Sequence, residues 1–340
     1  MMSPAFSQSG ISVVIPCRDA AATLPRQLKA LAEQAGPPAF EVVIVDNGST
    51  DDLAGASRGY EDRLKLRIVD ASGRAGVCHA RNVGVLAAHG KYVLICDADD
   101  VVDAGWVAAM TRVLRKPGGL VAGTLRYGRI NPDWVVKAMG LSSGLWLPAP
   151  YLGYLPFAYG CAMGIARTDY LLIGGMDESI VGGSDDVEFS WRAQETGLEF
   201  RFAEDAIVDY ALRAEPRSVF AQRRSYQRGD VLVWSRSIVA GRPVDGKSMR
   251  WSLNEALKLP GEYLRLQHAD PATQLAWATR AGGVLGSCEG HQRYRLCRRD
   301  PGPHLLTQVE TESGETCART PDPMQTPTSA TLLRTDPRQA

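Results

Sequence analysis

Three carboxylates stand within four positions in the sequence Asp97-Ala98-Asp99-Asp100. They directly follow an apolar run at residues 93–96, which predicts a buried strand. Ligands of open α/β sheets bind just beyond the carboxyl ends of strands. Carboxylates crowded there repel one another, so the pattern indicates a divalent cation shared with the phosphates of a ligand. A turn or a helix N-cap, both of which favour Asp, is the alternative explanation.

Alternating strands and helices precede this acidic sequence and must position it. Apolar strands are predicted at residues 11–16, 40–45 and 66–69, and helices at residues 23–34 and 76–89. This alternation is typical of an α/β fold with a mostly parallel, Rossmann-like sheet and helices on both faces. The polar loops that follow the strands would then gather along one sheet edge. Neither GxGxxG nor GxxxxGK[ST] occurs as a competing nucleotide motif.

The composition argues against several classes of protein. Basic and acidic residues number 38 each, so the net charge is zero and we expect no nucleic-acid partner. The hydrophobic fraction of 45% suits a globular core. No apolar stretch reaches the roughly eighteen residues of a membrane span, so the chain is expected to be cytoplasmic or at most peripheral to a membrane. Seven scattered cysteines without a CxxC pair also favour a reducing cytoplasm.

Five sequence blocks resemble, in the correct order, the signatures of family 2 glycosyltransferases. They are ISVVIP at 11–16, VIVDNGSTD at 43–51, ARNVG at 80–84, the acidic sequence at 97–100, and GGMDE at 174–178 with DDVEFSWR at 185–192. The acidic sequence resembles the DxD motif of that family, and the last block resembles its "GGFDE … ED" block. Each motif alone has low specificity. The resemblance depends on their order and spacing over residues 12–213.

The resemblance implies a GT-A fold, a nucleotide-diphosphate-sugar donor, a divalent metal (Mn²⁺ or Mg²⁺) and inversion at the anomeric carbon. A metal held by Asp99 and assisted by Asp97 would neutralise charge on the leaving diphosphate. Asp46 is expected to bind the nucleobase. Arg81 is expected to pair with a phosphate or to lock the acidic loop, with an ordinary helix-surface arginine as the alternative. The full set of expected donor-binding residues is Pro16, Asp46, Asn47, Ser49, Arg81, Asp97 and Ala98.

The second half of the resemblance supplies a base for the acceptor hydroxyl. Asp186 matches the catalytic aspartate of the "ED" motif, whereas Asp185 stands where the family usually has Glu. Asp186 also opens a predicted helix at residues 186–196, so an N-cap is its alternative role. Residues 127–159 are rich in Gly, Pro, Trp and Tyr, which is typical of a long loop region that shapes a pocket. Residues 208–213 are expected to return to the sheet.

Two positions depart from the family pattern. Ala162 replaces an Asn that often precedes the methionine of its block, and Tyr210 stands where the family often has a metal-binding His. Asp209 is therefore the expected substitute ligand. The QxxRW sequence of processive members is absent, because residues 222–226 read QRRSY. This absence favours the transfer of a single sugar over polymer synthesis.

Four parts are predicted along the chain. Residues 1–125 form the nucleotide-sugar-binding half of a GT-A domain, and residues 126–215 form its acceptor-binding and catalytic half. Residues 216–299 interleave arginines with apolar side chains and are predicted to form a helical C-terminal extension. Residues 300–340 hold six prolines and no aromatic residue, which predicts a disordered tail.

The expected partners are a nucleotide-diphosphate-sugar donor and a sugar, lipid-linked or small-molecule acceptor. Two other functions remain open at this point. A nucleotidyltransferase also places acids beside a Rossmann-like sheet, but it needs a Gly- and Lys/Arg-rich loop after the first strand, of which Cys17-Arg18-Asp19-Ala20 offers little. A non-catalytic nucleotide-sugar-binding protein would be consistent with the replaced Asn and His.

Overall fold

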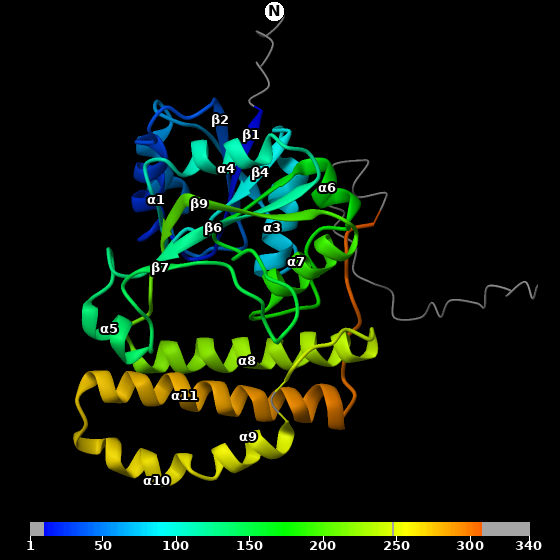
Figure 1. The fold of residues 1–340 in the computed structure, drawn as a ribbon. Helices are drawn as coiled ribbons and strands as arrows, with labels where there is room; N and C mark the ends of the chain where they lie inside the picture. The colour runs from blue at the N-terminus through cyan, green and yellow to red at the C-terminus, as the bar shows by residue number, and fades with distance from the viewer. Residues whose placement is uncertain (1–9, 247, 308–340) are drawn as a thin grey trace, which may run out of the picture.

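The computed structural model describes residues 10–246 and 248–307, the side chain of residue 267 excepted. Its centre is a nine-stranded sheet with the order β3-β2-β1-β4-β8-β6-β9-β5, and β7 pairs with β6 at the side (Figure 1). The first half of the sheet is parallel, as predicted. Its strands are β1 (Ile11–Cys17), β2 (Phe40–Asp46), β3 (Lys65–Asp70) and β4 (Tyr92–Ile95).

Helices cover both faces of this sheet. On one face α1 (Leu24–Ala32) and α4 (Trp106–Leu114) pack with α2 (Leu53–Ser57) into one buried cluster. On the other face α3 (Val77–Ala87) packs into a second cluster, together with α6 (Arg167–Leu172) and α7 (Asp185–Glu195). The predicted layering is therefore confirmed, because the apolar strands are buried from both sides.

Helix α3 lies unusually close to the sheet. A Cβ atom at Gly84 would come within 2.4 Å of Val14 Cγ1 and 2.8 Å of Val45 Cγ2. Glycine at this position allows the close approach, which fixes how α3 presents the residues before it, Arg81 and Asn82, toward the carboxyl edge of the sheet.

The second half of the sheet mixes directions. β8 (Met163–Ala166) runs antiparallel to β4 and β6 (Gly119–Arg126), whereas β6 and β9 (Glu199–Asp209) are parallel. The expected strand at residues 208–213 is wrong in its bounds. β9 ends at Asp209, and its earlier part was missed because exposed charged residues interrupt the apolar pattern.

Three shorter elements complete this region. β5 (Val101–Val102) pairs with the end of β9, and β7 (Leu145–Trp146) pairs with the end of β6. The region expected to be a loop between residues 127 and 159 also contains the helix α5 (Asp133–Ala138). The remainder of that region is irregular, as its glycines and prolines indicate.

The C-terminal region is helical, as predicted. α8 (Pro216–Val239) and α11 (Pro271–Gly290) lie side by side below the sheet, and α9 (Met249–Ala256) and α10 (Leu259–Leu264) form an outer layer beneath them (Figure 1). Glycines bring the two long helices into backbone contact, since a Cβ atom at Gly286 would come within 2.1 Å of the Arg224 carbonyl oxygen. No helix in the described ranges is long and apolar enough to span a bilayer.

Residues 300–307 pack against the body of the protein. The Leu306 amide donates to the Gly174 carbonyl at 2.8 Å, and the His304 amide donates to Asp177 Oδ1 at 2.8 Å. Asp300 pairs with Arg236 of α8. The predicted start of a disordered tail at residue 300 is therefore wrong. The prolines of this short segment gave no sign of packing, but its apolar residues Leu305 and Leu306 contact the body of the protein. The rest of the predicted tail, residues 308–340, lies outside the described residues.

Candidate active site

A buried arginine joins the two acidic parts of the predicted site. Arg81 on α3 is 4% exposed. Its Nη2 donates to Asp97 Oδ1 at 3.1 Å, and its Nη1 donates to Asp185 Oδ2 at 2.7 Å. Burial disfavours the charged guanidinium, but the fields of Asp97 and Asp185 outweigh burial and raise the pKa of Arg81 above its ordinary value. Arg81 therefore locks the acidic loop, and the alternative of a helix-surface arginine is excluded.

Gly160 leaves room for this arrangement. A Cβ atom at Gly160 would come within 2.6 Å of Arg81 Nη2, and the Gly160 amide donates to Asp186 Oδ2 at 3.0 Å. The next residue on α3, Asn82, donates to the Met176 carbonyl at 2.9 Å and accepts from the Met176 amide at 2.8 Å. Two adjacent residues of the ARNVG block thus tie the acidic loop and the GGMDE block to one helix.

Asp186 lies in the first turn of α7, which confirms the predicted helix to within one residue. The N-cap position belongs to Ser184, whose φ of 62° is left-handed, so Asp186 is not the N-cap. Burial, and then the neighbouring Asp185 carboxylate, raise the pKa of Asp186 to about 7. A carboxylate with this pKa can exchange a proton near neutral pH.

The loop before α7 is held by α8, a contact that the sequence did not reveal. A Cβ atom at Gly229 would come within 2.3 Å of the Gly183 carbonyl oxygen, so the loop and α8 touch backbone to backbone. Ser184 Oγ donates to Asp230 Oδ1, and the Tyr151 hydroxyl donates to Asp230 Oδ2 at 2.8 Å. A glycine inside a long helix is costly, and Gly229 is the signal that could have pointed to this contact.

The acidic loop contains a buried carboxylate with an unused oxygen. Asp100 is 1% exposed, and its Oδ1 accepts from the Ala211 amide at 2.7 Å. Asp100 Oδ2 has no hydrogen-bond partner among the described residues. Burial, and then the fields of Asp99 and Asp97, raise the pKa of Asp100 well above its ordinary value. Such an oxygen costs free energy unless a proton or a cation satisfies it.

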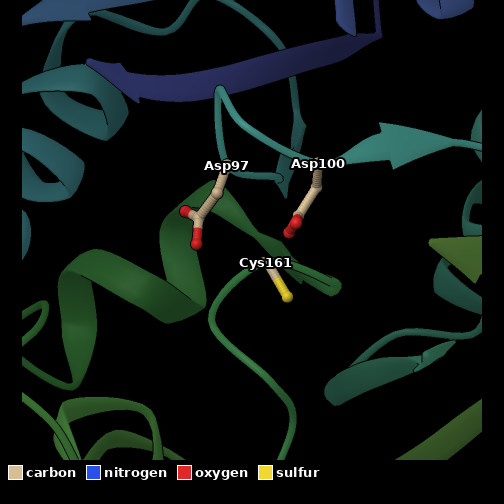
Figure 2. A group of neighbouring side chains, drawn as sticks. All are labelled: Asp97, Asp100 and Cys161. Atoms are coloured by element: carbon tan, nitrogen blue, oxygen red, sulfur yellow. The ribbon is translucent and has the colours of Figure 1, made fainter. Parts of the chain in front are cut away.

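Asp97, Asp100 and Cys161 converge at this point (Figure 2). Ligand atoms of the three side chains lie within 4.8 Å of one another. The sequence-based site included Asp97 but not Asp100 or Cys161. Burial, and then Asp100 and Asp97, raise the pKa of Cys161 well above the ordinary thiol value, so the thiol stays protonated and is a poor ligand. Asp99, the metal ligand that the resemblance implied, is exposed and is not a member of this group.

Asp209 does not belong to this cluster. It is fully buried, and its two oxygens pair with Arg126 Nε at 2.6 Å and with Arg129 Nη1 at 3.1 Å. Two guanidinium groups already neutralise the carboxylate, so the structure contradicts its predicted role as a metal ligand. Successive residues of a strand point to opposite faces, and the neighbouring Tyr210 lines a cavity between the sheet and the C-terminal helices instead.

The predicted donor-binding residues lie at the carboxyl ends of β1 and β2. Asp46 ends β2, and its Oδ1 accepts from the Ser49 amide at 2.8 Å. Asn47 is buried, and both its donors are used, in bonds to the carbonyls of Ala71 at 2.6 Å and Arg74 at 2.8 Å. Asn47 therefore organises the loop, whereas Asp46 Oδ2 has no hydrogen-bond partner among the described residues.

The remaining predicted donor-side residues, Pro16, Ser49 and Ala98, lie at the same edge. Pro16 lies in β1 opposite Val45, and Ala98 is buried in the acidic loop. Ser49 Oγ accepts from the Asp19 amide at 3.1 Å, which links the loops after β1 and β2. These contacts bring the loops together at one edge, as the strand order requires.

A cavity of about 950 Å³ lies between this edge and the C-terminal helices. Arg81, Asp97 and Asp186 line its sheet side, and Trp251 and Glu255 of α9 line its far side. Aromatic side chains form much of the wall between them, and most come from residues 127–159, the region expected to shape a pocket. They are Tyr127, Trp146, Tyr151, Phe157, Tyr159, Tyr210 and Tyr226.

The fold is shared with a solved glycosyltransferase structure. The structure is similar to that of mannosyltransferase PcManGT from Pyrobaculum calidifontis, solved in complex with GDP-Man and Mn²⁺. The TM-score is 0.59 at 20% identity, and the match covers 85% of this chain and 88% of that one. This likeness establishes the GT-A fold that the motifs predicted.

The sequence comparison agrees with the motifs. Residues 12–167 match the model described as "Glycosyl transferase family 2". The predicted family resemblance is therefore confirmed. The chain is also 27% identical over 234 residues to pre-mycofactocin glycosyltransferase of Mycobacterium tuberculosis, a match that covers 65% of this chain and 46% of that protein.

Glycosyltransferase AglE of Haloferax volcanii is 24% identical over 267 residues, with 75% of this chain and 83% of that protein covered. The chain spans less than half the length of the Mycobacterium relative that it matches.

Proposed function

We propose that this protein is an inverting glycosyltransferase. It transfers one sugar from a nucleotide-diphosphate-sugar donor to an acceptor hydroxyl, with help from a divalent metal and with Asp186 as the general base. The observation that carries the proposal is Arg81, which holds Asp97 of the acidic loop and Asp185 at the start of α7 beside one cavity. A transferase of this type needs a donor site and an acceptor base next to each other.

The donor half of the reaction is assigned to the carboxyl edge of the sheet. Asp46 would accept a hydrogen bond from the nucleobase through its free oxygen, and Asn47 and Ser49 would keep that loop in place. Pro16 and Ala98 would contribute the backbone wall of the nucleotide site. Arg81 would remain on its two carboxylates and balance the acidic loop while the donor binds.

The residues present fit a divalent cation. Asp97 and Asp100 would hold it from the buried side, where Asp100 Oδ2 lacks a partner in the described chain, and Asp99 would reach it from the exposed side. Carboxylate oxygens are the ligands that Mg²⁺ and Mn²⁺ prefer. When bound, the cation would neutralise the negative charge that grows on the leaving diphosphate.

The acceptor half is assigned to Asp186. The acceptor oxygen forms a bond to the anomeric carbon as the bond from that carbon to the diphosphate oxygen breaks. Asp186 takes the proton of the attacking hydroxyl. Its raised pKa, about 7, matches this task, because a stronger carboxylic acid would be a weaker base. The Gly160 amide, bonded to Asp186 Oδ2, keeps the carboxylate oriented.

The experiment uses the purified full chain with UDP-, GDP- and dTDP-sugars, with and without Mn²⁺. Donor binding is measured as a thermal shift, and turnover as release of nucleoside diphosphate by transfer to water. Asp186→Asn is expected to keep the donor shift but to lose turnover by a factor on the order of 10² to 10⁴. Asp99→Ala is expected to lose both signals.

Asp205→Asn is the matched control, because Asp205 is an exposed carboxylate paired with Arg112 outside the cavity. Undiminished turnover in Asp186→Asn would overturn the assignment of the base. A donor that binds without any turnover in the parent protein would favour a non-catalytic binder. The absence of a thermal shift with every donor would overturn the proposal as a whole.

A further inference from the structure

The outermost helices of the C-terminal region present large apolar side chains to solvent. Leu253 of α9 is 48% exposed, Leu257 directly after α9 is 80% exposed, and Leu264 at the end of α10 is 70% exposed. Leu253 and Leu257 are four residues apart, so they lie on the same side of the helix. Figure 1 shows that these helices form the layer farthest from the sheet.

The opposite side of the same helices is attached to the body of the protein. Ser252 is buried and its hydroxyl bonds to Ser287 of α11 at 2.8 Å, and Leu259 packs in a buried cluster with Ala281 and Val284. The exposed leucines are therefore not residues that would be buried if the two helices packed on the rest of the protein, since the helices are already packed there. They face outward because the inner face is already packed.

The charged side chains of α9 and α10 also differ between the inner and the outer side of this layer. Glu255 and Glu262 both pair with Arg280 of α11, so their charge is compensated from beneath. Arg250 and Arg265 are exposed, and neither has an ion pair with any residue of the described ranges. The outward face thus combines apolar side chains with uncompensated positive charge, which we call the α9–α10 face.

An apolar groove adjoins the α9–α10 face. A cavity of about 590 Å³ lies between α8, α10 and α11 and is lined by Phe220, Tyr263, Leu266 and Trp277. Arg217 also lines this groove and is exposed. A groove with apolar walls and a basic side chain suits an acyl chain and a phosphate headgroup.

We propose that the α9–α10 face docks on the surface of an anionic lipid membrane. Leucines that enter the interface and basic side chains that meet anionic headgroups are the two contributions that hold a helix in the plane of a bilayer. A second copy of the chain fits less well, because a twofold contact would bring Arg250 and Arg265 against the same positive charges. Since Trp251 and Glu255 of α9 also line the central cavity, docking would bring that cavity close to the lipid.

The test is sedimentation of the full chain with vesicles. Phosphatidylcholine vesicles with and without phosphatidylglycerol serve as probes, each at low and high salt. Binding is expected with the anionic vesicles and should weaken as salt is raised. The double variant Leu253→Asp/Leu257→Asp is expected to bind at least about tenfold less, and each of Arg250→Ala and Arg265→Ala about fivefold less.

Leu172→Asp is the matched control, because Leu172 is 86% exposed at the end of α6, away from the α9–α10 face (Figure 1). An equal loss of binding in this control would overturn the proposal, as would a failure of the parent protein to sediment with anionic vesicles. Light scattering distinguishes membrane docking from dimerisation through the same face. A dimer that the double variant dissociates, without any change in vesicle binding, would assign the face to a second copy instead.

Discussion

Replacing Arg81 by glutamine should destabilise the protein and should do so in a pH-dependent way. The guanidinium is 4% exposed and bonds to Asp97 and Asp185. Removing one partner of a buried ion pair costs about 3–5 kcal/mol, because the other charge stays buried without compensation. Typical domains are stable by about 5–15 kcal/mol, so the variant should fold with a much reduced free energy of unfolding.

The pH dependence has a definite sign. Burial and Asp185 raise the pKa of Asp186 to about 7 although Arg81 lowers it, so without the guanidinium this pKa lies higher still. The folded variant then binds more protons at Asp186 than the folded parent protein does near neutral pH, and its stability relative to the parent protein increases as the pH falls from about 8 to about 5. Arg81 also lowers the pKa of Asp186, so the variant should need a higher pH to reach full turnover.

Urea unfolding of the two proteins across this pH range measures the effect. Arg112→Gln is the control, because Arg112 pairs with Asp205 on the surface, where such pairs contribute little. Equal urea midpoints for Arg81→Gln and Arg112→Gln at every pH would show that the buried ion pairs of Arg81 contribute no more to stability than a surface pair. If Arg81→Gln does not fold at all, Arg81→Lys, which keeps one charge, should recover part of the stability.

Further consequences can be measured on the same purified protein. Donor turnover should fall about tenfold per pH unit below about 7, as Asp186 is protonated, and a flat profile between pH 5 and 8 would contradict its role. Gly84→Ala should cost roughly 1–3 kcal/mol in urea unfolding, since the added methyl would lie 2.4 Å from a β1 side chain, whereas Gly59→Ala, with open space around it, should not. Asp100→Asn should abolish the thermal shift caused by Mn²⁺ without lowering the melting temperature of the metal-free protein; a lower temperature would indicate a structural carboxylate.

The parallel half of the fold was predictable because its signals are local. Strands β1, β2 and β4 are continuous apolar runs, and α1 and α3 place apolar residues at helical spacing. β9 was placed too late in the chain because its first part carries exposed charges on one face. Local patterns therefore identify buried elements more securely than elements at the solvent boundary.

The site was predictable in its residue types but not in its pairing. Motif order identified Arg81, Asp97 and Asp186, but nothing in the sequence states that Arg81 reaches Asp185, 104 positions away. The sequence does not show on which face each acidic side chain lies, and this decides which carboxylate is left without a partner. The sequence therefore suggested Asp209 as a metal ligand, whereas Asp209 is paired with Arg126 and Asp100 Oδ2 has no partner among the described residues. The contribution of α8 was missed because it lies outside every motif.

The packing of residues 304–306 on the GGMDE block has a consequence for biosynthesis. The Glu178 amide donates to the His304 carbonyl, and the Gly174 carbonyl accepts from the Leu306 amide, at 2.9 and 2.8 Å. These partners are synthesised more than a hundred residues after the block itself. A nascent chain must therefore leave these hydrogen bonds unmade until residue 306 has left the ribosome, so the GGMDE block completes its contacts late in synthesis.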